Sequence, residues 1–237
     1  MEIKRWLKRT VNKLFWDSYA IVYDDITKYY DAHKQLNCFV MNFMSKKIKN
    51  GVVFDAGCGT GELSILLSSK YKVLAGDFSE PMLKRLKTKI KKNKIKNITP
   101  KMVDLNEKLV FRDRKFDAVI NVHSLFMLED IFFTLEEFCR VVKKNGYLII
   151  AHHKPIKIGV IIKKIIEENG IIKGFFDLLH LFFAGMFNVI LGFLHRKMYG
   201  EMQADKIIKF VKIKKCNIIC SKSLYNDFDD VLIFKKR

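Results

Sequence analysis

A glycine-rich turn constrains this chain more than any other segment. An apolar, β-branched run ends at Asp55, and Gly57, Gly59 and Gly61 follow at every second position. A helical apolar pattern begins directly after them, at Leu63. This order predicts a strand, a tight turn and a helix. Because glycine exposes bare backbone and a helix N-terminus offers unpaired N–H groups, the turn is a candidate ligand site.

The spacing of the glycines indicates which ligand the turn accepts. Dinucleotide-binding turns read G-x-G-x-x-G, whereas this turn reads acid-x-G-x-G-x-G. Asp55 and Glu62 would repel a pyrophosphate, but they would not repel a ligand that carries an ammonium or sulfonium group. The alternative interpretation is an ordinary strand-to-helix turn that binds nothing.

Strands and helices alternate along most of the chain. We expect strands at 52–55, 72–76, 99–103, 116–122 and 147–151, and helices at 2–16, 19–45, 63–69, 81–96 and 130–142, the last closed by Asn145–Gly146. This alternation predicts an α/β fold with a doubly wound, mostly parallel sheet. Four strands end in an acidic or polar residue, namely Asp55, Asp77, Asp104 and Asn121. They lie at the edge where open α/β sheets bind ligands.

Three segments resemble the class I S-adenosylmethionine-dependent methyltransferases, most closely the small-molecule and quinone-biosynthesis type. These segments are Tyr23–Asp24, Val53–Gly61 and Gly76–Leu83, and the resemblance extends over about residues 17–152. It implies a helix at 204–214 and strands at 217–221 and 231–234, joined by a turn at Asn226–Asp227. The expected fold is therefore a mostly parallel seven-stranded Rossmann-like sheet with an antiparallel C-terminal strand.

The resemblance also implies S-adenosylmethionine as cofactor and a role for each residue that matches the motifs. The three glycines would lie against its methionine part, with Cys58 in the same turn, and Asp55 would receive its amino group. Asp77 would accept hydrogen bonds from both ribose hydroxyls. The other implied contacts are Phe78 and Met82 on the adenine, Asp104 and Leu105 at its edge, Asn121 and His123 at the methyl-transfer cavity, and Tyr19 and Tyr23 closing the site. The aromatic residues and Met82 also fit a plain core, and Asp104 also fits a cap.

Methyl transfer demands little of the protein, because the sulfonium is already a good leaving group and alignment governs the rate. A general base is needed only for a protonated nucleophile. His123 is the first candidate base, and His152 and His153, after the fifth strand, are the second. Each of them also fits a structural histidine. No Cys-x-x-Cys pair or zinc-like Cys/His spacing occurs among the five cysteines, so we expect reduced thiols and no metal.

The formal net charge of +19 predicts attraction to an anionic surface, which could be nucleic acid, acidic lipid or an acidic partner. The lysines could equally serve only to solvate helix faces. In the helix at 2–16, apolar residues such as Trp6 and Leu14 occupy one face, and basic residues such as Arg9 and Lys13 occupy the other. This pattern fits a helix in a membrane interface, or a helix that packs on the domain with its lysines in water.

Residues 155–200 read as an apolar helical insertion, and Phe175 to Leu194 has the length of a membrane span. A single crossing is excluded, because the strands after it must rejoin the sheet. The insertion is therefore a lid over an apolar substrate, a lid that dips into a membrane, or a buried helix. The expected units are N-terminal helices at 1–45, a methyltransferase core at 46–154 and 201–237, and this insertion.

The leading functional hypothesis is methyl transfer to a small, lipophilic or membrane-associated acceptor. The first alternative is an RNA or protein methyltransferase, which the charge favours. No base-methylation motif follows the fourth strand, however, so nucleic acid is the less favoured partner. The second alternative is a non-catalytic protein of the same fold that holds cofactor or lipid. The first 16 residues lack a signal-peptide h-region, which predicts a cytoplasmic protein, with membrane association as the added option.

Overall fold

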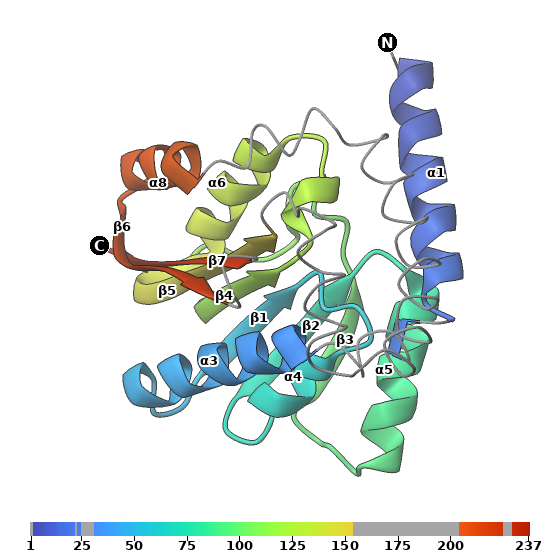
Figure 1. Ribbon diagram of the computed structural model, residues 1–237, viewed down its shortest axis with the longest axis horizontal. Coiled ribbons are helices and arrows are strands. Elements are labelled where there is room, and N and C mark those ends of the chain that lie inside the picture. The colour runs from blue at the N-terminus through green and yellow to red at the C-terminus, as the bar shows by residue number, and fades with distance from the viewer. Residues whose placement is uncertain (1, 22, 25–30, 154–203, 225–228) are drawn as a thin grey trace, which may run out of the picture.

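The computed structural model describes residues 2–21, 23–24, 31–153, 204–224 and 229–237 (Figure 1). The side chains of residues 2–8, 31, 32 and 153 are not part of that description. The insertion expected at 155–200 and the turn expected at Asn226–Asp227 lie outside the described residues.

A seven-stranded sheet forms the centre of the molecule, in the order β3-β2-β1-β4-β5-β7-β6 (Figure 1). Its strands are β1 (Val52–Ala56), β2 (Lys72–Asp77), β3 (Ile98–Met102), β4 (Phe116–Val122), β5 (Val142–His153), β6 (Cys216–Leu224) and β7 (Asp229–Lys236). The pairs among β1 to β5 are parallel, and β7 runs antiparallel to both β5 and β6. The sheet order and the reversed strand confirm the expected fold class.

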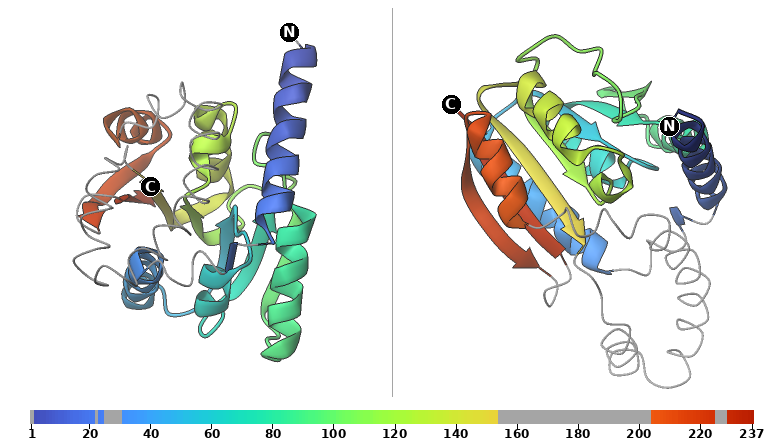
Figure 2. Two further views of the ribbon diagram at one scale, coloured as in Figure 1. Left: turned by 45° about the vertical axis from the view of Figure 1, so that its right-hand side comes forward. Right: turned by 90° about the horizontal axis from the view of Figure 1, so that it is seen from above.

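Helices cover both faces of the sheet (Figures 1 and 2). They are α1 (Glu2–Tyr19), α3 (Asp31–Lys47), α4 (Glu62–Leu67), α5 (Glu80–Lys92), the 3-10 helix η1 (Leu125–Met127), α6 (Ile131–Val141) and α8 (Ala204–Ile213). Successive strand residues alternate between the two faces. In β1, Val53 packs in a core with α3, α4 and α5, whereas Phe54 packs in a second core with α6 and α8.

The helix expected to close at Asn145–Gly146 ends earlier than predicted. It stops at Val141, and the next residue, Val142, already pairs with Phe116 of β4. The register then shifts, because Tyr147 pairs with Ala118. Asn145 and Gly146 therefore form an irregularity inside β5 rather than a helix cap. A side chain at Gly146 would collide with the backbone oxygens of Asp117 and Lys143, so the bulge requires glycine there.

Helix α1 stands at one end of the sheet and contacts α5 (Figure 2). It extends to Tyr19, which was expected to begin the next helix. Among its described side chains, Arg9 reaches the domain through ion pairs, while the Leu14 side chain is 62% exposed. Trp16 also packs against the core that contains Phe54, whereas the Lys13 side chain is 51% exposed. Both apolar and basic residues of α1 thus contact the domain. None of the described helices is both long enough and apolar enough to cross a bilayer.

Candidate functional site

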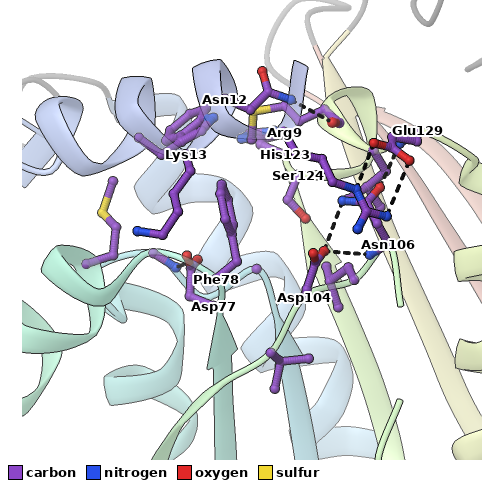
Figure 3. Close-up of a pocket in the computed structure, with 18 of the residues that line it drawn as sticks. Arg9, Asn12, Lys13, Asp77, Phe78, Asp104, Asn106, His123, Ser124 and Glu129 are labelled. Atoms are coloured by element: carbon purple, nitrogen blue, oxygen red, sulfur yellow. Dashed lines mark hydrogen bonds and ion pairs between the residues drawn. The ribbon is translucent and has the colours of Figure 1, made fainter. Parts of the chain in front are cut away.

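A cavity of about 270 Å³ opens at the carboxyl edge of β1, β2, β3 and β4, beneath α1 (Figure 3). We call it the crevice. Of the predicted site residues, the crevice is lined by Tyr23, Gly57, Gly59, Asp77, Phe78, Met82, Asp104, Leu105 and His123. Its volume lies near the lower end of the range for small-molecule pockets, about 300–1,000 Å³. The structure therefore brings together most of the residues that the motifs singled out.

The glycine turn forms the floor of the crevice. Gly57, Gly59 and Gly61 have φ values of 76°, 53° and 82°, a region that side chains disfavour. The backbone N–H groups of Gly57 and Cys58 both donate to the carbonyl oxygen of Gly76. A Cβ at Gly59 would meet only the Tyr23 ring, at 3.8 Å, so this stretch of backbone faces the crevice bare. Gly61 instead lies against Leu86, where a Cβ would collide, and its role is packing.

Asp77 holds the turn and the start of α5 together from the end of β2. The backbone N–H of Gly59 donates to Oδ2 at 2.8 Å, and the backbone N–H of Ser79 donates to Oδ1 at 2.9 Å. Burial raises the pKa of this carboxyl above its usual value, although the two backbone hydrogen bonds act in the opposite direction. Each oxygen keeps a second lone pair, so the carboxylate can also accept two hydroxyl donors.

One wall of the crevice is apolar and carries polar groups only at its rim. Phe78, Met82 and Leu105 line this wall, and Met82 and Leu105 are buried. Asp104 Oδ1 accepts from the backbone and the side chain of Asn106, at 2.8 and 3.0 Å. Asp104 thus both lines the crevice and caps its own turn (Figure 3). This arrangement suits a flat, largely apolar ring with polar edges.

Asp55 lies below the turn, in a smaller polar cavity that shares Tyr23 and Gly57 with the crevice. Ser64 Oγ donates to Asp55 Oδ2 at 2.5 Å. Burial raises the pKa of Asp55 to about 6, and the nearby Asp77 charge adds to the increase. Cys58 lines the same small cavity, and burial raises the pKa of its thiol well above the ordinary value.

The smaller cavity also contains two residues of α3 that sequence reasoning missed. His33 Nδ1 lies 3.0 Å from Glu62 Oε2, and the Asn37 amide lies 3.3 Å from the same imidazole nitrogen. This contact to His33 lowers the pKa of Glu62. The buried Asn37 Oδ1 has no hydrogen-bond partner among the described residues, so the cavity offers an acceptor to a ligand donor.

His123 follows β4 and lines the crevice. Its Nε2 lies 3.0 Å from Oδ1 of Asp229, the first residue of β7, and its ring centroid lies 5.8 Å from that of His33. His152 is buried within β5 and lines neither cavity, and the side chain of His153 is not described. Of the two candidate bases whose side chains are described, His123 is thus the one at the crevice.

Two other predicted site residues lie beside the crevice rather than in its lining. The Asn121 amide donates to the Ala56 carbonyl oxygen at 2.8 Å and to Ser124 Oγ, which braces the strand ends against each other. Tyr19 stacks on Phe15 and makes an edge contact with Tyr23, so it supports the tyrosine that lines the crevice. The two tyrosines are mostly buried, and burial raises the pKa of both.

Helix α1 is tied to both rims of the crevice, which the sequence did not reveal. At one rim, Arg9 Nε lies 2.8 Å from Glu129 Oε1 (Figure 3). Arg9 Nη1 also lies 2.6 Å from Glu107 Oε1. At the other rim, the Ser79 hydroxyl donates to Asp17 Oδ1 at 2.7 Å. Arg9 and Glu129 are 120 residues apart, so no local pattern could have found this clamp.

The residues present fit S-adenosylmethionine. The bare backbone of Gly59 leaves room for the methionine part, whereas Gly57 lies against Ser124. The acidic Asp55, and Asn37 Oδ1 with no hydrogen-bond partner among the described residues, suit an ammonium donor. Asp77 is at the place for ribose hydroxyls, and the apolar wall suits the adenine. Within the described part of the chain, no cluster of His, Cys, Asp and Glu could hold a metal ion.

Comparison with known proteins agrees with this fit. Residues 54–150 match the family model described as "Methyltransferase domain". The chain is 32% identical over 114 residues to a ubiquinone biosynthesis O-methyltransferase from Pelagibacter ubique, covering 48% of this chain and 46% of that protein. It is 29% identical over 106 residues to a phosphatidylethanolamine N-methyltransferase from Cereibacter sphaeroides, covering 44% and 52%.

A solved structure shows the same fold over almost the whole length. Magnesium protoporphyrin IX methyltransferase from Synechocystis, with bound S-adenosylhomocysteine, superposes with a TM-score of 0.68 at 17% identity, covering 97% of this chain and all of that one. The chain spans about half the length of the curated relatives that it matches. Residues 54–150, which include the glycine turn, thus match a methyltransferase domain, and the chain has the fold of a solved methyltransferase over almost its whole length.

Proposed function

We propose that this protein transfers the methyl group of S-adenosylmethionine to a small, lipophilic acceptor. The observation that carries the proposal is the bare glycine floor, with Asp77 and Asp55 beside it and an apolar wall opposite. Two relatives, named for ubiquinone biosynthesis and for phosphatidylethanolamine, support a lipophilic acceptor of the same general kind. The apolar lining near Met127 and Leu128 is consistent with it.

The residues of the chain bind and align the reactants rather than provide new chemistry. When bound, the cofactor supplies an electrophilic methyl group on a sulfonium leaving group. Asp77 would hold the ribose, the Gly59 backbone would lie against the methionine part, and Asp55 with Asn37 would hold the amino group. The roof formed by α1 would exclude water from the crevice. His123 would accept the proton from a protonated acceptor atom.

Calorimetric titration with S-adenosylmethionine tests the cofactor site. We expect the wild-type chain to bind, and Asp77→Ala to weaken binding by about 100-fold or more, because charge-assisted hydrogen bonds to two hydroxyls are lost. Asp113→Ala is the matched control, since Asp113 is exposed and pairs with Arg140, a residue outside the crevice. Equal affinity in the Asp77 variant and the control would remove Asp77 from the site.

A second part of the proposal is contact with an anionic membrane surface, from which such an acceptor would come. It is supported by the net charge of +19 and by the exposed apolar side chains of Val11, Leu14 and Ile21. Flotation with phosphatidylglycerol-containing vesicles across a salt series should show salt-sensitive binding. Stronger, salt-sensitive retardation of RNA in a gel would instead favour the RNA methyltransferase alternative.

A further inference from the structure

We propose that Asp229 is a positioning residue for proton transfer: its buried carboxylate holds the His123 imidazole so that Nδ1, and not Nε2, takes the acceptor's proton. The inference deepens the proposed function and rests on it, because His123 is the base only if the chain methylates a protonated acceptor atom. It assigns a role to β7, which lies outside the segment that matches the methyltransferase-domain model.

The geometry of the pair fixes the tautomer. His123 Nε2 and Asp229 Oδ1 are 3.0 Å apart, and their side chains are 11% and 1% exposed. An ionised carboxylate can only accept a hydrogen bond, so the shared proton belongs to Nε2. A neutral imidazole with its proton on Nε2 has its basic lone pair on Nδ1. The proton-accepting atom is therefore the one turned away from Asp229.

The backbone at His123 supports a functional reading of this pair. Its φ is 54°, in the left-handed region that residues with a side chain disfavour. The conformation is held by the backbone N–H of His123, which donates to the carbonyl oxygen of Ala151 in β5 at 2.9 Å. An unfavourable backbone conformation that the surrounding structure enforces is typical of functional sites. Here it occurs in the loop residue that faces both the crevice and β7.

Asp229 reaches this position only through the order of the sheet. β7 lies between β5 and β6, and Asp229 pairs with His153 on one side and Leu224 on the other. The strand thereby delivers a carboxylate to a histidine 106 residues away in sequence. Burying a carboxylate without a cationic or hydrogen-bonding partner destabilises the folded state. The contact with His123 therefore offsets part of the cost of burying Asp229.

Other titratable groups surround His123 and bear on its pH dependence. From α3 comes His33, whose ring lies 5.8 Å away, and from α4 comes Glu62, which pairs with His33. From β5 comes the buried His152. The crevice itself adds Tyr23, Asp77, Asp104, Arg9, Lys13 and Glu129. Of these groups, Asp229 is the one in direct hydrogen-bond contact with Nε2.

The proton balance of the step is simple. The acceptor's O–H or N–H loses its proton to Nδ1 while its electron pair forms the bond to the methyl carbon, and the bond from that carbon to sulfur breaks. His123 becomes an imidazolium, and the Asp229 carboxylate offsets the new charge while keeping its hydrogen bond to Nε2–H. The proton then passes from Nδ1 to water, which restores neutral His123.

Nitrogen NMR of protein labelled with ¹⁵N-histidine tests the inference without any acceptor. We expect the neutral His123 ring of the wild-type chain, with S-adenosylhomocysteine added, to be in the Nε2–H tautomer. The variant Asp229→Asn should lower the pKa of His123 by about 1 unit or more, because a partner that favours the imidazolium is gone. Asparagine can also donate to Nε2, which would shift the ring toward Nδ1–H.

The matched control is Asp230→Asn, which removes a carboxylate from the next residue of the same strand. Asp230 accepts a hydrogen bond from Ser223 Oγ at 2.6 Å rather than from His123. Its variant should leave the tautomer and pKa of His123 unchanged. The signal of His123 is assigned by its loss in His123→Gln.

Activity provides the second readout, with a polyprenyl phenol as the probe acceptor. For Asp229→Asn we expect kcat to fall at least tenfold and the pKa of the kcat–pH profile to fall together with that of His123. Asp229→Glu, which retains the carboxylate, should recover part of the rate. A purely structural role would lower kcat without moving the profile.

An Nδ1–H tautomer in the wild-type chain, or an unchanged pKa for His123 in Asp229→Asn, would overturn the inference. These results are independent of the proposed function, which fails instead if the wild-type chain does not bind S-adenosylmethionine. A chain that binds the cofactor but shows no effect of Asp229→Asn on His123 would therefore lose only this inference.

Discussion

Two buried carboxylates, Asp55 and Asp77, end neighbouring strands and face the same glycine turn. Each has a raised pKa, and burial is the main cause for both. In the free protein these groups therefore favour their neutral forms more than an exposed aspartate does. A ligand that brings an ammonium group or hydroxyl donors replaces the lost hydration, so binding and stability are linked at these residues.

The raised pKa of Asp55 predicts how stability depends on pH. The group has a pKa of about 6 when folded, against about 3.9 when unfolded, so the folded state binds more protons between these values. Its contribution is therefore most favourable below about pH 4 and is lost as the pH rises through about 6. We expect Asp55→Asn to stabilise the cofactor-free chain at pH 7 by about 1–3 kcal/mol, since the variant has no charge to bury.

Urea unfolding of the wild type and the variant at pH 4 and pH 7 measures this difference. The advantage of Asp55→Asn should be present at pH 7 and vanish at pH 4. Asp117→Asn is a useful control, because Asp117 is a strand aspartate that is only partly buried and pairs with Lys143. A stability gain that is the same at both pH values would contradict the assignment.

At the level of single residues, the sequence predicted the acids and the open glycines but not every role. Asp77 and Gly59 could be found because the motif is local. Gly61 of the glycine motif serves packing, and Asn121 at the end of β4 braces the strands, roles that the sequence pattern does not distinguish from ligand contact. Asp229 and Arg9 were missed because their partners are far away in sequence.

Helix α1 covers the crevice and is attached to the rest of the domain at two places. Arg9 joins it to the loops after β3 and β4, and Asp17 joins it to the start of α5. Asp24, just beyond the helix, adds an ion pair to Lys89 at 2.7 Å. Burial tends to raise the pKa of Asp24, but hydrogen bonds from Lys89 and Thr60 outweigh it and lower the pKa. Opening the crevice requires at least one of these ties to break.

The ion pairs of Arg9 with Glu107 and Glu129 predict that this residue controls how fast the cofactor dissociates. We expect Arg9→Met to weaken S-adenosylmethionine binding about 3- to 10-fold, mainly through faster dissociation, because the freed helix opens more often. A network of this partly exposed kind contributes on the order of 1 kcal/mol. Leu14→Ala is the control on the same helix, since its side chain is exposed and lies outside the crevice.

Stopped-flow displacement of the cofactor measures the dissociation rate in both variants. Raised salt should accelerate dissociation from the wild type and have little effect on Arg9→Met, because the ion pairs are screened. Equal rates for the two variants would show that the clamp does not govern exchange.

The elements themselves were largely predictable, because their apolar periods are clear. The strand at 116–122 matches β4, and the helix at 204–214, which the family resemblance implied, matches α8 within one residue. The face that α1 turns to the domain was not predictable, because an amphipathic pattern separates two faces without naming the inner one. The early start of β5 was also missed, since Asn145–Gly146 serves a bulge as readily as a helix end.

Over the whole molecule, the sheet separates two apolar cores. Phe54 is fully buried at the centre of one of them, with aromatic contacts to Phe111, Phe116 and Phe138. A Cβ at Gly76 would also touch the Phe54 ring, so this side chain lies directly behind the backbone that accepts the glycine turn. The core and the floor of the crevice therefore share a residue.

Truncation of this side chain should affect stability more than any surface change. We expect Phe54→Ala to lower the free energy of unfolding by about 3–5 kcal/mol, because it leaves a cavity among three rings. Phe133→Ala on α6 is the control, since that ring is 37% exposed, and it should cost clearly less. Equilibrium unfolding in urea gives both values. Similar losses in the two variants would contradict the central place of Phe54.

The overall topology followed from the order of strands and helices, together with the resemblance to a known family. What could not follow from it is the meeting of distant segments in one crevice. α1 and the loops after β2, β3 and β4 converge there, and the first residue of β7 contacts His123 of its lining. Only the folded sheet sets their distances. Contacts between residues that are far apart in the sequence leave no repeating pattern in it, so they cannot be predicted from periodicity.

The place of β7 between β5 and β6 has a consequence for synthesis. During synthesis, β1 to β5 are made before β7, so one edge of β5 has no strand paired with it in the growing chain. This strand contains the apolar residues Leu148, Ile149 and Ile150. Exposed strand edges of this type can pair with other chains until β7 is in place. The strand that covers the edge of β5 is also the one that carries Asp229, so the pairing of β7 both completes the sheet and places that carboxylate beside His123.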